Sequence, residues 1–499
     1  GYCKPGLKIS GGKTSLFDQD LTTMNIEELR QIRGEKVAYL AQSAIATFNP
    51  ALKINEQVTE SAVIHGSKTQ IEANEFAKGL YHSLDLPNPE NIGSRYPHQV
   101  SGGQLQRLMA AMALCGEPSL LVLDEPTTAL DVTTQIEVLK AFKKVIRERG
   151  AAAIYVTHDL AVVAQIADRI VVLYNGDIQE KGSAHEVISK PRHPYTKRLM
   201  QAVRPLPAAG KKEKENKTDK VIQINGVFAG YGGNVISNPK DVILKDINLE
   251  LSRGEVLGVI GESGSGKSTL ARVIAGLLPS FKGEILLDNQ KLQSRLEDRP
   301  RSELRKIQFV YQMADTAINP KQTIGNILGR PLEFYLNIYG QKNKKRVLDL
   351  LDMVELPKEF YTRYPHELSG GQKQRINLAR ALAAEPEVLL CDEVTSALDS
   401  IVGANIIELL RGLRKNLGVS FVFISHDLST VSAFADSIAV MYKGVIAEIG
   451  SVHKVLSPPS HPYTDLLISS VPELRVGWLE DADKNIQNAK NQLEKEEIT

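Results

Sequence analysis

The sequence of 499 residues has few cysteines and no long hydrophobic stretch. Its three cysteines, Cys3, Cys115 and Cys391, lack the spacing of metal ligands, which argues for a reducing compartment and against disulfides, zinc and iron–sulfur clusters. No run reaches the roughly 18 apolar residues that a membrane-spanning helix needs, and no secretory signal is recognisable. The net charge of +1 gives no sign of the basic surface that nucleic-acid-binding proteins carry.

The feature that organises the chain is an internal repeat. Hydrophobic residues make up 42% and charged residues 24%, as in soluble globular proteins, and the length predicts two to four domains. Four unrelated motifs occur twice, and the members of each pair are 268 positions apart, which predicts two copies of one domain. The pairs are Arg95-Tyr96-Pro97-His98 and Arg363-Tyr364-Pro365-His366, Asp124-Glu125 and Asp392-Glu393, His158-Asp159-Leu160 and His426-Asp427-Leu428, and His193-Pro194-Tyr195-Thr196 and His461-Pro462-Tyr463-Thr464.

Polar stretches without apolar periodicity mark the boundaries of the copies. We expect a first domain at residues 1–203, a flexible linker at 204–220 and a second domain at 221–475. Residues 476–499 form a polar tail with helical character, and the sequence assigns it no function.

Within each copy, strand and helix patterns alternate, which predicts an α/β fold with a mainly parallel sheet. Residues 42–96 and 312–364 have a helical pattern, so we expect them to form separate helical subdomains. Short apolar runs around Asn175-Gly176 and Lys443-Gly444 predict β-hairpins. Four continuous apolar runs predict strands buried on both faces. They are Leu120–Leu123, Ile154–Val156, Val388–Leu390 and Phe421–Ile424.

A glycine-rich stretch in the second copy fits the phosphate-binding pattern G-x-x-x-x-G-K-[ST]. An apolar run, Val256–Ile260, precedes it, and Leu270–Leu278 has the pattern of the helix that must follow. We expect Lys267 to reach the β- and γ-phosphates and the Ser268 hydroxyl to ligate Mg²⁺. The alternative is a glycine-rich turn with a chance lysine, which the flanking strand and helix disfavour. The stretch consists of Gly261, Glu262, Ser263, Gly264, Ser265, Gly266, Lys267, Ser268 and Thr269.

Other candidate site residues of the second copy follow apolar runs. Asp392 and Glu393 end one strand, where Asp392 would hold magnesium and Glu393 would orient or deprotonate the attacking water. Gln312 ends another strand and could contact the magnesium and that water, and the neutral imidazole of His426 could donate to the γ-phosphate. Tyr231 is a candidate for stacking on adenine. Each residue alone has a simpler explanation, such as an acidic turn or a solvated side chain.

Two Ser-Gly-Gly-Gln motifs precede amphipathic helices. Serine is a preferred N-cap, and the two glycines let a phosphate approach the N–H groups at the start of the helix. The motifs therefore indicate a second anion site on the far side of a nucleotide pocket, or simply capped helices. They are Ser101, Gly102, Gly103 and Gln104 in the first copy and Ser369, Gly370, Gly371 and Gln372 in the second.

Taken together, the motifs resemble the ATPase domain of ABC transporters. The resemblance implies an α/β fold with two tandem ABC-type P-loop ATPase domains, each with a helical subdomain and a small antiparallel β subdomain. It implies that ATP and Mg²⁺ bind, and that the two domains pair within the chain, with each ATP between one phosphate loop and the other domain's Ser-Gly-Gly-Gln. By register it assigns catalytic roles to Gln42, Glu125 and His158 and a metal role to Asp124. Residues 129–131 and 397–399 match the family's communicating loops.

Further motifs are similar to those of the peptide and nickel importers within that family. They are the Arg-Tyr-Pro-His sequences, Asn49-Pro50, Asn319-Pro320 and the closing His-Pro-Tyr-Thr sequences. The resemblance implies an ATPase that drives uptake of peptides, or of a related small solute or metal complex. Its implied partners are two transmembrane permease subunits and an external solute-binding protein, without nucleic acid. The implied location is peripheral, at the cytoplasmic face of the bacterial plasma (inner) membrane.

The sequence departs from the family pattern in three places. The first copy has no phosphate loop, and we expect that N-terminal truncation explains this, because its later motifs are intact and the chain begins with Gly1. Val394 stands where the first copy has Pro126, a change of turn stiffness rather than of chemistry. No cysteine follows Cys391, whereas some relatives carry an iron–sulfur cluster after the His-Pro-Tyr turn.

Two other functions share these motifs. A translation factor with two such ATPase domains would need a long charged helical linker, and residues 204–220 are too few. It would also leave the His-Pro-Tyr endings unexplained. An exporter ATPase would share the chemistry, and a neighbouring gene for a binding protein would argue against it.

Overall fold

The computed structural model describes residues 9–127, 130–203, 219–234, 238–396, 398–458 and 460–498, which fall into two compact units. Most of the predicted linker, residues 204–218, lies outside the described residues, as do residue 129 and residue 397 of the predicted communicating loops. The predicted domain boundaries therefore stay predictions. Unit 1 comprises Gly1–Leu130, Thr134–His158 and Ile166–Asp168, and unit 2 comprises Asp131–Thr133, Asp159–Gln165 and Arg169–Thr499.

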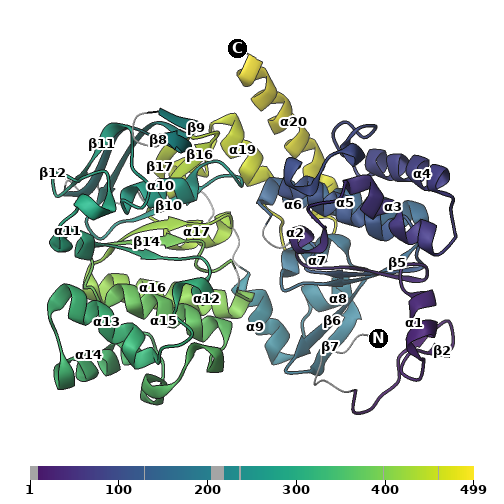
Figure 1. Ribbon diagram of the computed structural model, residues 1–499, viewed down its shortest axis with the longest axis horizontal. Coiled ribbons are helices and arrows are strands. Elements are labelled where there is room, and N and C mark those ends of the chain that lie inside the picture. Colours follow the sequence, from purple (N-terminus) through teal and green to yellow (C-terminus); the bar gives the residue numbers. More distant parts are fainter. Residues whose placement is uncertain are drawn as a thin grey trace. The chain divides into compact units, whose positions relative to one another are not determined.

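Unit 1 contains a three-stranded parallel sheet of order β3-β4-β5, with helices packed against it (Figure 1). Val37 pairs with Leu120, and Leu120 pairs with Ala152, in continuous register. Leu40, Leu108 and other buried side chains of its strands and helices form one core. Its elements are β1 (Ser15–Leu16), β2 (Gln19–Asp20), α1 (Ile26–Ile32), β3 (Val37–Leu40), α2 (Ala44–Thr47), α3 (Ile54–Ile64), α4 (Gln70–Ser83), α5 (Gly102–Leu114), β4 (Leu120–Asp124), α6 (Val132–Arg149) and β5 (Ala152–Val156).

Unit 2 contains more strands than unit 1, in three sheets. Its strands are β6 (Arg169–Tyr174), β7 (Asp177–Ser183), β8 (Lys220–Asn234), β9 (Asn238–Ser252), β10 (Val256–Ile260), β11 (Lys282–Leu287), β12 (Gln290–Lys291), β13 (Ile307–Val310), β14 (Val388–Asp392), β15 (Ser420–Ile424), β16 (Ser437–Tyr442) and β17 (Val445–Ser451). Its helices are α7 (Leu160–Ile166), α8 (Ala184–Ser189), α9 (Pro194–Ala202), α10 (Lys267–Ile274), α11 (Arg301–Lys306), α12 (Ala314–Ala317), α13 (Ile324–Leu336), α14 (Gly340–Met353), α15 (Gly370–Leu382), α16 (Ser400–Leu417), α17 (Leu428–Phe434), α18 (Val452–Val455), α19 (Pro462–Ser469) and α20 (Trp478–Ile498).

The central sheet of unit 2 has the order β13-β14-β15-β10-β16-β17, and all neighbours are parallel except β16 and β17. Strands β10, β14 and β15 are buried along their whole lengths, as predicted for Val388–Leu390 and Phe421–Ile424. Because the carboxyl ends of parallel strands meet at one edge, the residues after β10, β14 and β15 lie together. This edge carries the candidate site.

The remaining parts of unit 2 confirm the expected subdomains. An antiparallel sheet of order β12-β11-β8-β9 and the helical pair α13–α14 lie at opposite ends of unit 2, with β14 between them (Figure 1). In unit 1 the predicted helical segment forms α2, α3 and α4. The predicted hairpins connect β6 to β7 and β16 to β17, through turns in which Asn175 and Lys443 have positive φ of 52° and 46°.

The prediction of strands buried on both faces is wrong for unit 1, where only Leu121 and Leu123 of the run Leu120–Leu123 are buried. Ile154–Val156 was expected to be buried on both faces, but Ile154 is 51% and Val156 46% exposed. The strand that contains them, β5, is the edge of a three-stranded sheet. The corresponding strand of unit 2, β15, is paired on both edges and packs against α10 and β9. No described part of unit 1 supplies equivalents of β10 and α10, so one edge of β5 and the face that carries Ile154 and Val156 stay open, whereas Tyr155 packs against the core.

The polar tail is helical. Helix α20 packs against α19, and Trp478, Leu479, Ile486 and Leu493 form its buried stripe. Its helical spacing explains why a mostly polar segment forms an ordered helix: the few apolar residues share one face. None of the described helices is long and apolar enough to cross a membrane.

Candidate functional site

The glycine-rich stretch forms a loop between β10 and α10, as the sequence predicts. Gly261 has φ +146°, and a Cβ there would lie 2.2 Å from the Met441 carbonyl oxygen. Gly266, the N-cap of α10, has φ +106°, a left-handed conformation that favours glycine. The loop therefore turns tightly against the end of β16 and leads directly into the start of α10, the geometry that presents backbone N–H groups to an anion.

Lys267 lies buried inside the loop. Its Nζ donates to the carbonyl oxygens of Gly261 and Glu262, both at 2.8 Å. Burial lowers the pKa of Lys267, against the opposing attraction of nearby carboxylates, of which Glu393 contributes most. The loop thus holds a cation at its centre, at the position where the sequence predicts a phosphate ligand.

Two predicted metal ligands are in direct contact. The Ser268 hydroxyl donates to Asp392 Oδ1 at 2.9 Å, which joins the first turn of α10 to the end of β14. Asp392 is 7% exposed, and this burial raises the pKa of its carboxyl group. A hydroxyl and a carboxylate are hard oxygen donors of the kind that Mg²⁺ prefers.

The other predicted catalytic residues of the second copy surround Glu393. Gln312 Nε2 donates to Glu393 Oε2 at 2.7 Å, and His426 Nδ1 lies 3.6 Å from the same oxygen. Burial alone would raise the pKa of Glu393, but the interaction with His426 outweighs it and holds that pKa below its usual value. For the same reason the pKa of His426 is raised, although burial alone would lower it. The structure therefore brings together a carboxylate and an imidazole, and each favours the charged form of the other.

Tyr231 contacts the loop helix through its hydroxyl. The Tyr231 oxygen lies 3.4 Å from Thr269 Oγ1 and accepts a hydrogen bond from Arg272 at 3.2 Å. The predicted stacking on adenine is not tested by these contacts, but they place Tyr231 next to the phosphate loop. This was the weakest sequence signal, because an exposed loop tyrosine is common.

Tyr463 contributes to the site although it was not among the predicted site residues. Its hydroxyl accepts the backbone N–H of Glu262, the second residue of the loop, at 2.7 Å. The sequence signal was present, because Tyr463 belongs to the repeated His-Pro-Tyr-Thr motif. That motif indicated only a subgroup, since no sequence pattern shows which residues a distant turn will contact.

The corresponding residues of the first copy also come together. Gln42 Nε2 donates to Glu125 Oε2 at 2.7 Å, and His158 Nδ1 lies 2.9 Å from Glu125 Oε1. Asp124 accepts a hydrogen bond from Tyr39 at 2.6 Å, whereas Asp392 of the second copy accepts one from Ser268. Tyr39 was not predicted, and its pKa is raised by this hydrogen bond.

Both Ser-Gly-Gly-Gln motifs begin helices, as predicted. Ser101 Oγ accepts the N–H of Gln104 at the start of α5, and Gln104 Oε1 accepts the N–H of Ser101 in return. Ser369 and Gln372 form the same reciprocal pair at the start of α15. These capping boxes fix the helix starts but leave the second anion site a prediction.

Comparison with protein families gives two matches, each of which occurs twice. The model described as ABC transporter matches residues 6–128 and 244–396, which together are more than half of the chain. The model described as oligopeptide/dipeptide transporter, C-terminal region, matches residues 179–230 and 447–497. The doubled matches agree with the internal repeat.

Several curated proteins resemble almost the whole chain. The glutathione import ATP-binding protein GsiA of Escherichia coli K12 is 38% identical over 480 residues, and the match covers 91% of this chain and 77% of that protein. The GsiA protein of Salmonella paratyphi A gives the same identity and coverage. A solved dimeric structure of the ATP-binding cassette MJ0796 bound to ADP and Pi is 33% identical and covers 46% of this chain and 98% of that one. Its TM-score is 0.41.

Proposed function

The chain belongs to the ATP-binding proteins of ABC transporters, and on that premise we propose how its second half hydrolyses ATP. The chain is an ATP-hydrolysing subunit of an importer of the oligopeptide/dipeptide type. In our proposal Gly261–Thr269 binds the phosphates, Asp392 and Ser268 hold Mg²⁺, and Glu393 orients or deprotonates the attacking water. The observation that carries the proposal is the shared edge of the sheet, where Ser268 meets Asp392 and Gln312 meets Glu393.

The residues around the loop fit a magnesium–nucleotide complex. Ser268 Oγ and Asp392 Oδ1 lie within 2.9 Å of each other, so both can face one small cation. When bound, Mg²⁺ would neutralise the charge that develops on the phosphate oxygens. Lys267 would then add its positive charge from inside the loop, and Gln312 would hold the Glu393 carboxylate toward the water. His426 would donate to the γ-phosphate from the opposite side of Glu393.

We extend the proposal to the first half and to the helix starts. Gln42, Glu125 and His158 repeat the arrangement around Glu393, and Asp124 takes the place of Asp392. From the family resemblance alone, we propose that Ser101–Gln104 completes the ATP site of the second-half loop and Ser369–Gln372 that of the first half. A Ser101→Glu change would place a negative charge against the phosphates. Unchanged turnover at the second-half loop would refute this role.

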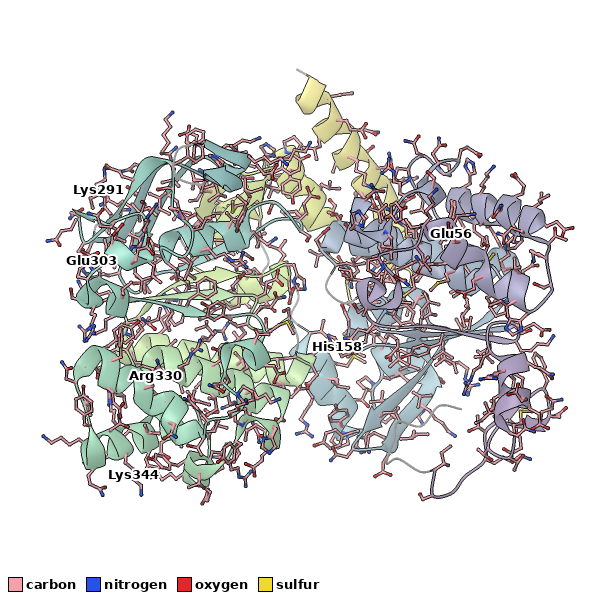
Figure 2. All side chains as sticks on the ribbon, viewed as in Figure 1. Glu56, His158, Lys291, Glu303, Arg330 and Lys344 are labelled. Carbon is pink, nitrogen blue, oxygen red and sulfur yellow. The ribbon has the colours of Figure 1, made fainter. Side chains whose placement is uncertain are left out.

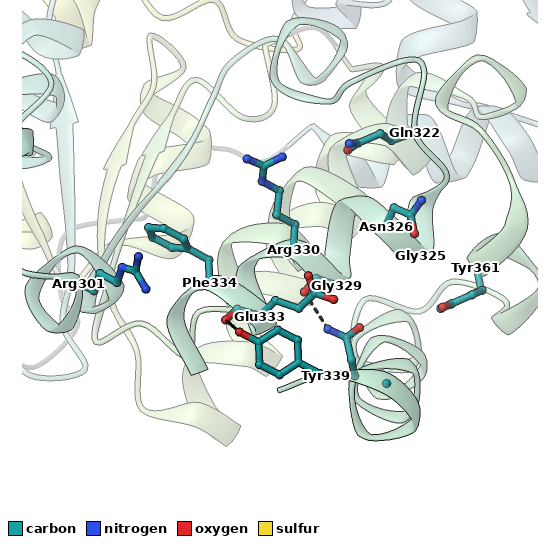
Figure 3. A pocket seen from close by; sticks show the side chains of 12 residues that line it. Arg301, Gln322, Gly325, Asn326, Gly329, Arg330, Glu333, Phe334, Tyr339 and Tyr361 are labelled. Atoms are coloured by element: carbon teal, nitrogen blue, oxygen red, sulfur yellow. Dashed lines mark hydrogen bonds between the residues drawn. The ribbon is translucent and has the colours of Figure 1, made fainter. Parts of the chain in front are cut away.

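The family also implies membrane permeases as partners, and we propose that one of them docks on α13. A hollow of about 710 Å³ lies along α13, α14 and the loop before them, and Figure 3 shows the side chains that line it. Arg301 lies over the ring of Phe334 at 4.6 Å, and Arg330 reaches the same hollow from the next turn of α13. This segment follows Gln312 in the chain, so a permease bound here would be linked directly to the catalytic centre.

The same segment of the first half carries opposite charge. Positions three and seven of α13 are Asn326 and Arg330, whereas those positions of α3 are Glu56 and Glu60. All four are exposed, and Glu56 and Arg330 are labelled in Figure 2. No described residue forms an ion pair with Arg330, Glu56 or Glu60. We propose that two different permease subunits bind, one with an acidic segment for α13 and one with a basic segment for α3.

A charge reversal tests the docking proposal. In Arg330→Glu, repulsion of the acidic permease segment should reduce co-purification of permease on the order of tenfold, and more at low salt. Uptake of labelled glutathione or another peptide by the reconstituted importer should fall with it. Lys342→Glu is the matched control, since Lys342 is an exposed cation of α14 outside the hollow. Equal loss in both variants, or in neither, would contradict the proposed site.

The cargo and the location follow from the relatives. We propose a peptide-like solute as the cargo, because the similar curated proteins are named for glutathione import. An external solute-binding protein would deliver it to the two permeases. The chain would associate peripherally with them at the cytoplasmic face of the bacterial plasma membrane. Membranes that lack the permeases test this location, and we expect the chain to be released from them.

A further inference from the structure

We propose that Tyr463 is a positioning residue for the phosphate loop, and that its hydroxyl sets the affinity of that loop for ATP. The proposal rests on the ATP site proposed above. It assigns a role to the second His-Pro-Tyr-Thr motif, which lies in the region matched by the oligopeptide/dipeptide C-terminal model.

A single peptide unit of the loop is held from both sides. Its carbonyl oxygen, on Gly261, accepts a hydrogen bond from Lys267 Nζ at 2.8 Å. Its N–H, on Glu262, donates to the Tyr463 hydroxyl at 2.7 Å. Because the two groups belong to one rigid plane, rotation of the unit would break both bonds. Tyr463 therefore fixes the direction of the carbonyl that holds the loop lysine.

The Tyr463 side chain is itself fully buried and packed. Its relative exposure is 0%, and its ring stacks on Tyr442 with centroids 4.2 Å apart. Tyr442 ends β16, the strand that pairs with β10 just before the loop. The backbone of Tyr463 is fixed as well, since its N–H donates to His461 Nδ1 at the start of α19. The ring that carries the hydroxyl therefore packs on the same sheet that supports the loop.

This support matters most when ATP binds. Lys267 must exchange the carbonyl oxygens of Gly261 and Glu262 for phosphate oxygens. During that exchange the Gly261–Glu262 peptide unit loses its cationic partner, whereas the Tyr463 hydroxyl continues to accept its N–H. Without this hydrogen bond, ATP itself would have to supply more of the ordering of the loop, at the expense of affinity.

The first copy contains the same pair of rings. Tyr195, in the equivalent motif, packs on Tyr174 with centroids 4.3 Å apart and ring planes tilted by 32°, and its N–H donates to His193 Nδ1. The repetition indicates that the ring pair is a feature of the motif. The hydrogen bond from the phosphate loop belongs to Tyr463 of the second copy.

The test is Tyr463→Phe in the full chain purified with its partner permeases. Phe keeps the ring and removes the hydroxyl, so the half-buried Glu262 loses the hydrogen bond that its N–H donates to Tyr463. We expect the KM for ATP to rise about three- to tenfold with kcat nearly unchanged, the signature of lost binding rather than lost chemistry. Labelling by an azido-ATP, mapped to residues 219–498, should require proportionally more nucleotide.

Tyr81→Phe is the matched control. Tyr81 is 1% exposed and donates to Asn55 Oδ1 at 3.0 Å in unit 1, so this change also deletes a buried tyrosine hydroxyl. If both variants lose thermal stability but neither changes the KM, Tyr463 is merely structural and the proposal is overturned. A fall in kcat at constant KM would overturn it as well. If the full wild-type chain carries no label within residues 219–498, the proposed ATP site itself is wrong.

Discussion

Glu125 and Glu393, the two glutamates given the catalytic role, have backbone conformations that non-glycine residues rarely adopt. Their φ angles are 48° and 50°. Each follows the last residue of a parallel strand, β4 or β14, so the left-handed turn redirects the chain while the carboxylate stays beside its glutamine and histidine partners. Such strain persists only where the surroundings enforce it. The repetition of the strain in both copies links it to the arrangement of Gln42, Glu125 and His158 and of Gln312, Glu393 and His426.

At Gly261 the prediction concerns the loop backbone. Gly261→Ala would combine a φ of +146° with a Cβ 2.2 Å from the Met441 oxygen. We expect a loss of roughly 1–3 kcal/mol in stability and loss of ATP binding, measured by thermal melting and nucleotide titration. In Gly412→Ala, a control at an exposed position of helix α16 with no atom near the new Cβ, stability should stay or rise by up to about 1 kcal/mol. Wild-type ATP binding in Gly261→Ala would contradict this account.

At the residue scale, the sequence predicted the candidate catalytic residues better than the residues that hold the site in place. Gln312, Glu393 and His426 follow apolar strands, and parallel strands must place their carboxyl ends together. Tyr39 and Tyr463 were missed because their partners, Asp124 and Glu262, are 85 and 201 positions away in the chain. Only the packing of whole elements brings such pairs into contact, and one sequence carries no signal for it.

At the scale of elements, a charged network joins the two sheets that flank the site. Arg253, after β9, contacts Glu387, at the start of β14, at 2.6 Å, and Lys306 of α11 contacts the same carboxylate at 2.9 Å. Both cations also contact Asp288, after β11. Burial alone would raise the pKa of Glu387, but its two cationic partners hold it below the usual value. The network therefore anchors β14, which carries Asp392.

The network predicts a pH-dependent contribution to stability. Because the pKa of Glu387 is lower in the folded chain than in the unfolded one, its stabilisation is present above about pH 4.5 and lost as the pH falls. Glu387→Gln should therefore lower the free energy of unfolding by about 1 kcal/mol at pH 7, since the pair is partly exposed. Near pH 3 the difference from wild type should vanish. Chemical denaturation at both pH values measures this difference in the free energy of unfolding. Glu359→Gln is the control, because Glu359 is exposed and forms no ion pair with a described residue. A loss of stability that grows toward acid pH would contradict the expectation.

Element patterns also show where sequence interpretation fails. The helical subdomains, hairpins and parallel strands were predicted correctly because each has a local signature. The exposure of β5 was not, because burial of an apolar strand depends on its neighbours. An apolar run shows that a strand can be covered; the strands and helices around it decide whether it is.

At the scale of the whole molecule, the chain consists of two copies of one design with different surfaces. The catalytic arrangement repeats almost unchanged, whereas α3 carries Glu56 and Glu60 and α13 carries Asn326 and Arg330. Repeated chemistry and divergent surface charge are what the proposed binding of two different permeases requires. The repeat itself was readable from the sequence, because four motifs share one register. The charge contrast became interpretable only when the exposed helix positions were known.

The most direct test of the account is the effect of Glu393→Gln on turnover and on ATP binding, measured in the same preparation. A background with Glu125→Gln removes the corresponding residue of the first half, and Glu359→Gln serves as the control for the exchange itself. The account predicts that turnover falls by about 100-fold or more while ATP stays bound, because the amide keeps the shape of the side chain but is not a base. Normal turnover in Glu393→Gln would contradict the role given to this residue, and so would loss of ATP binding.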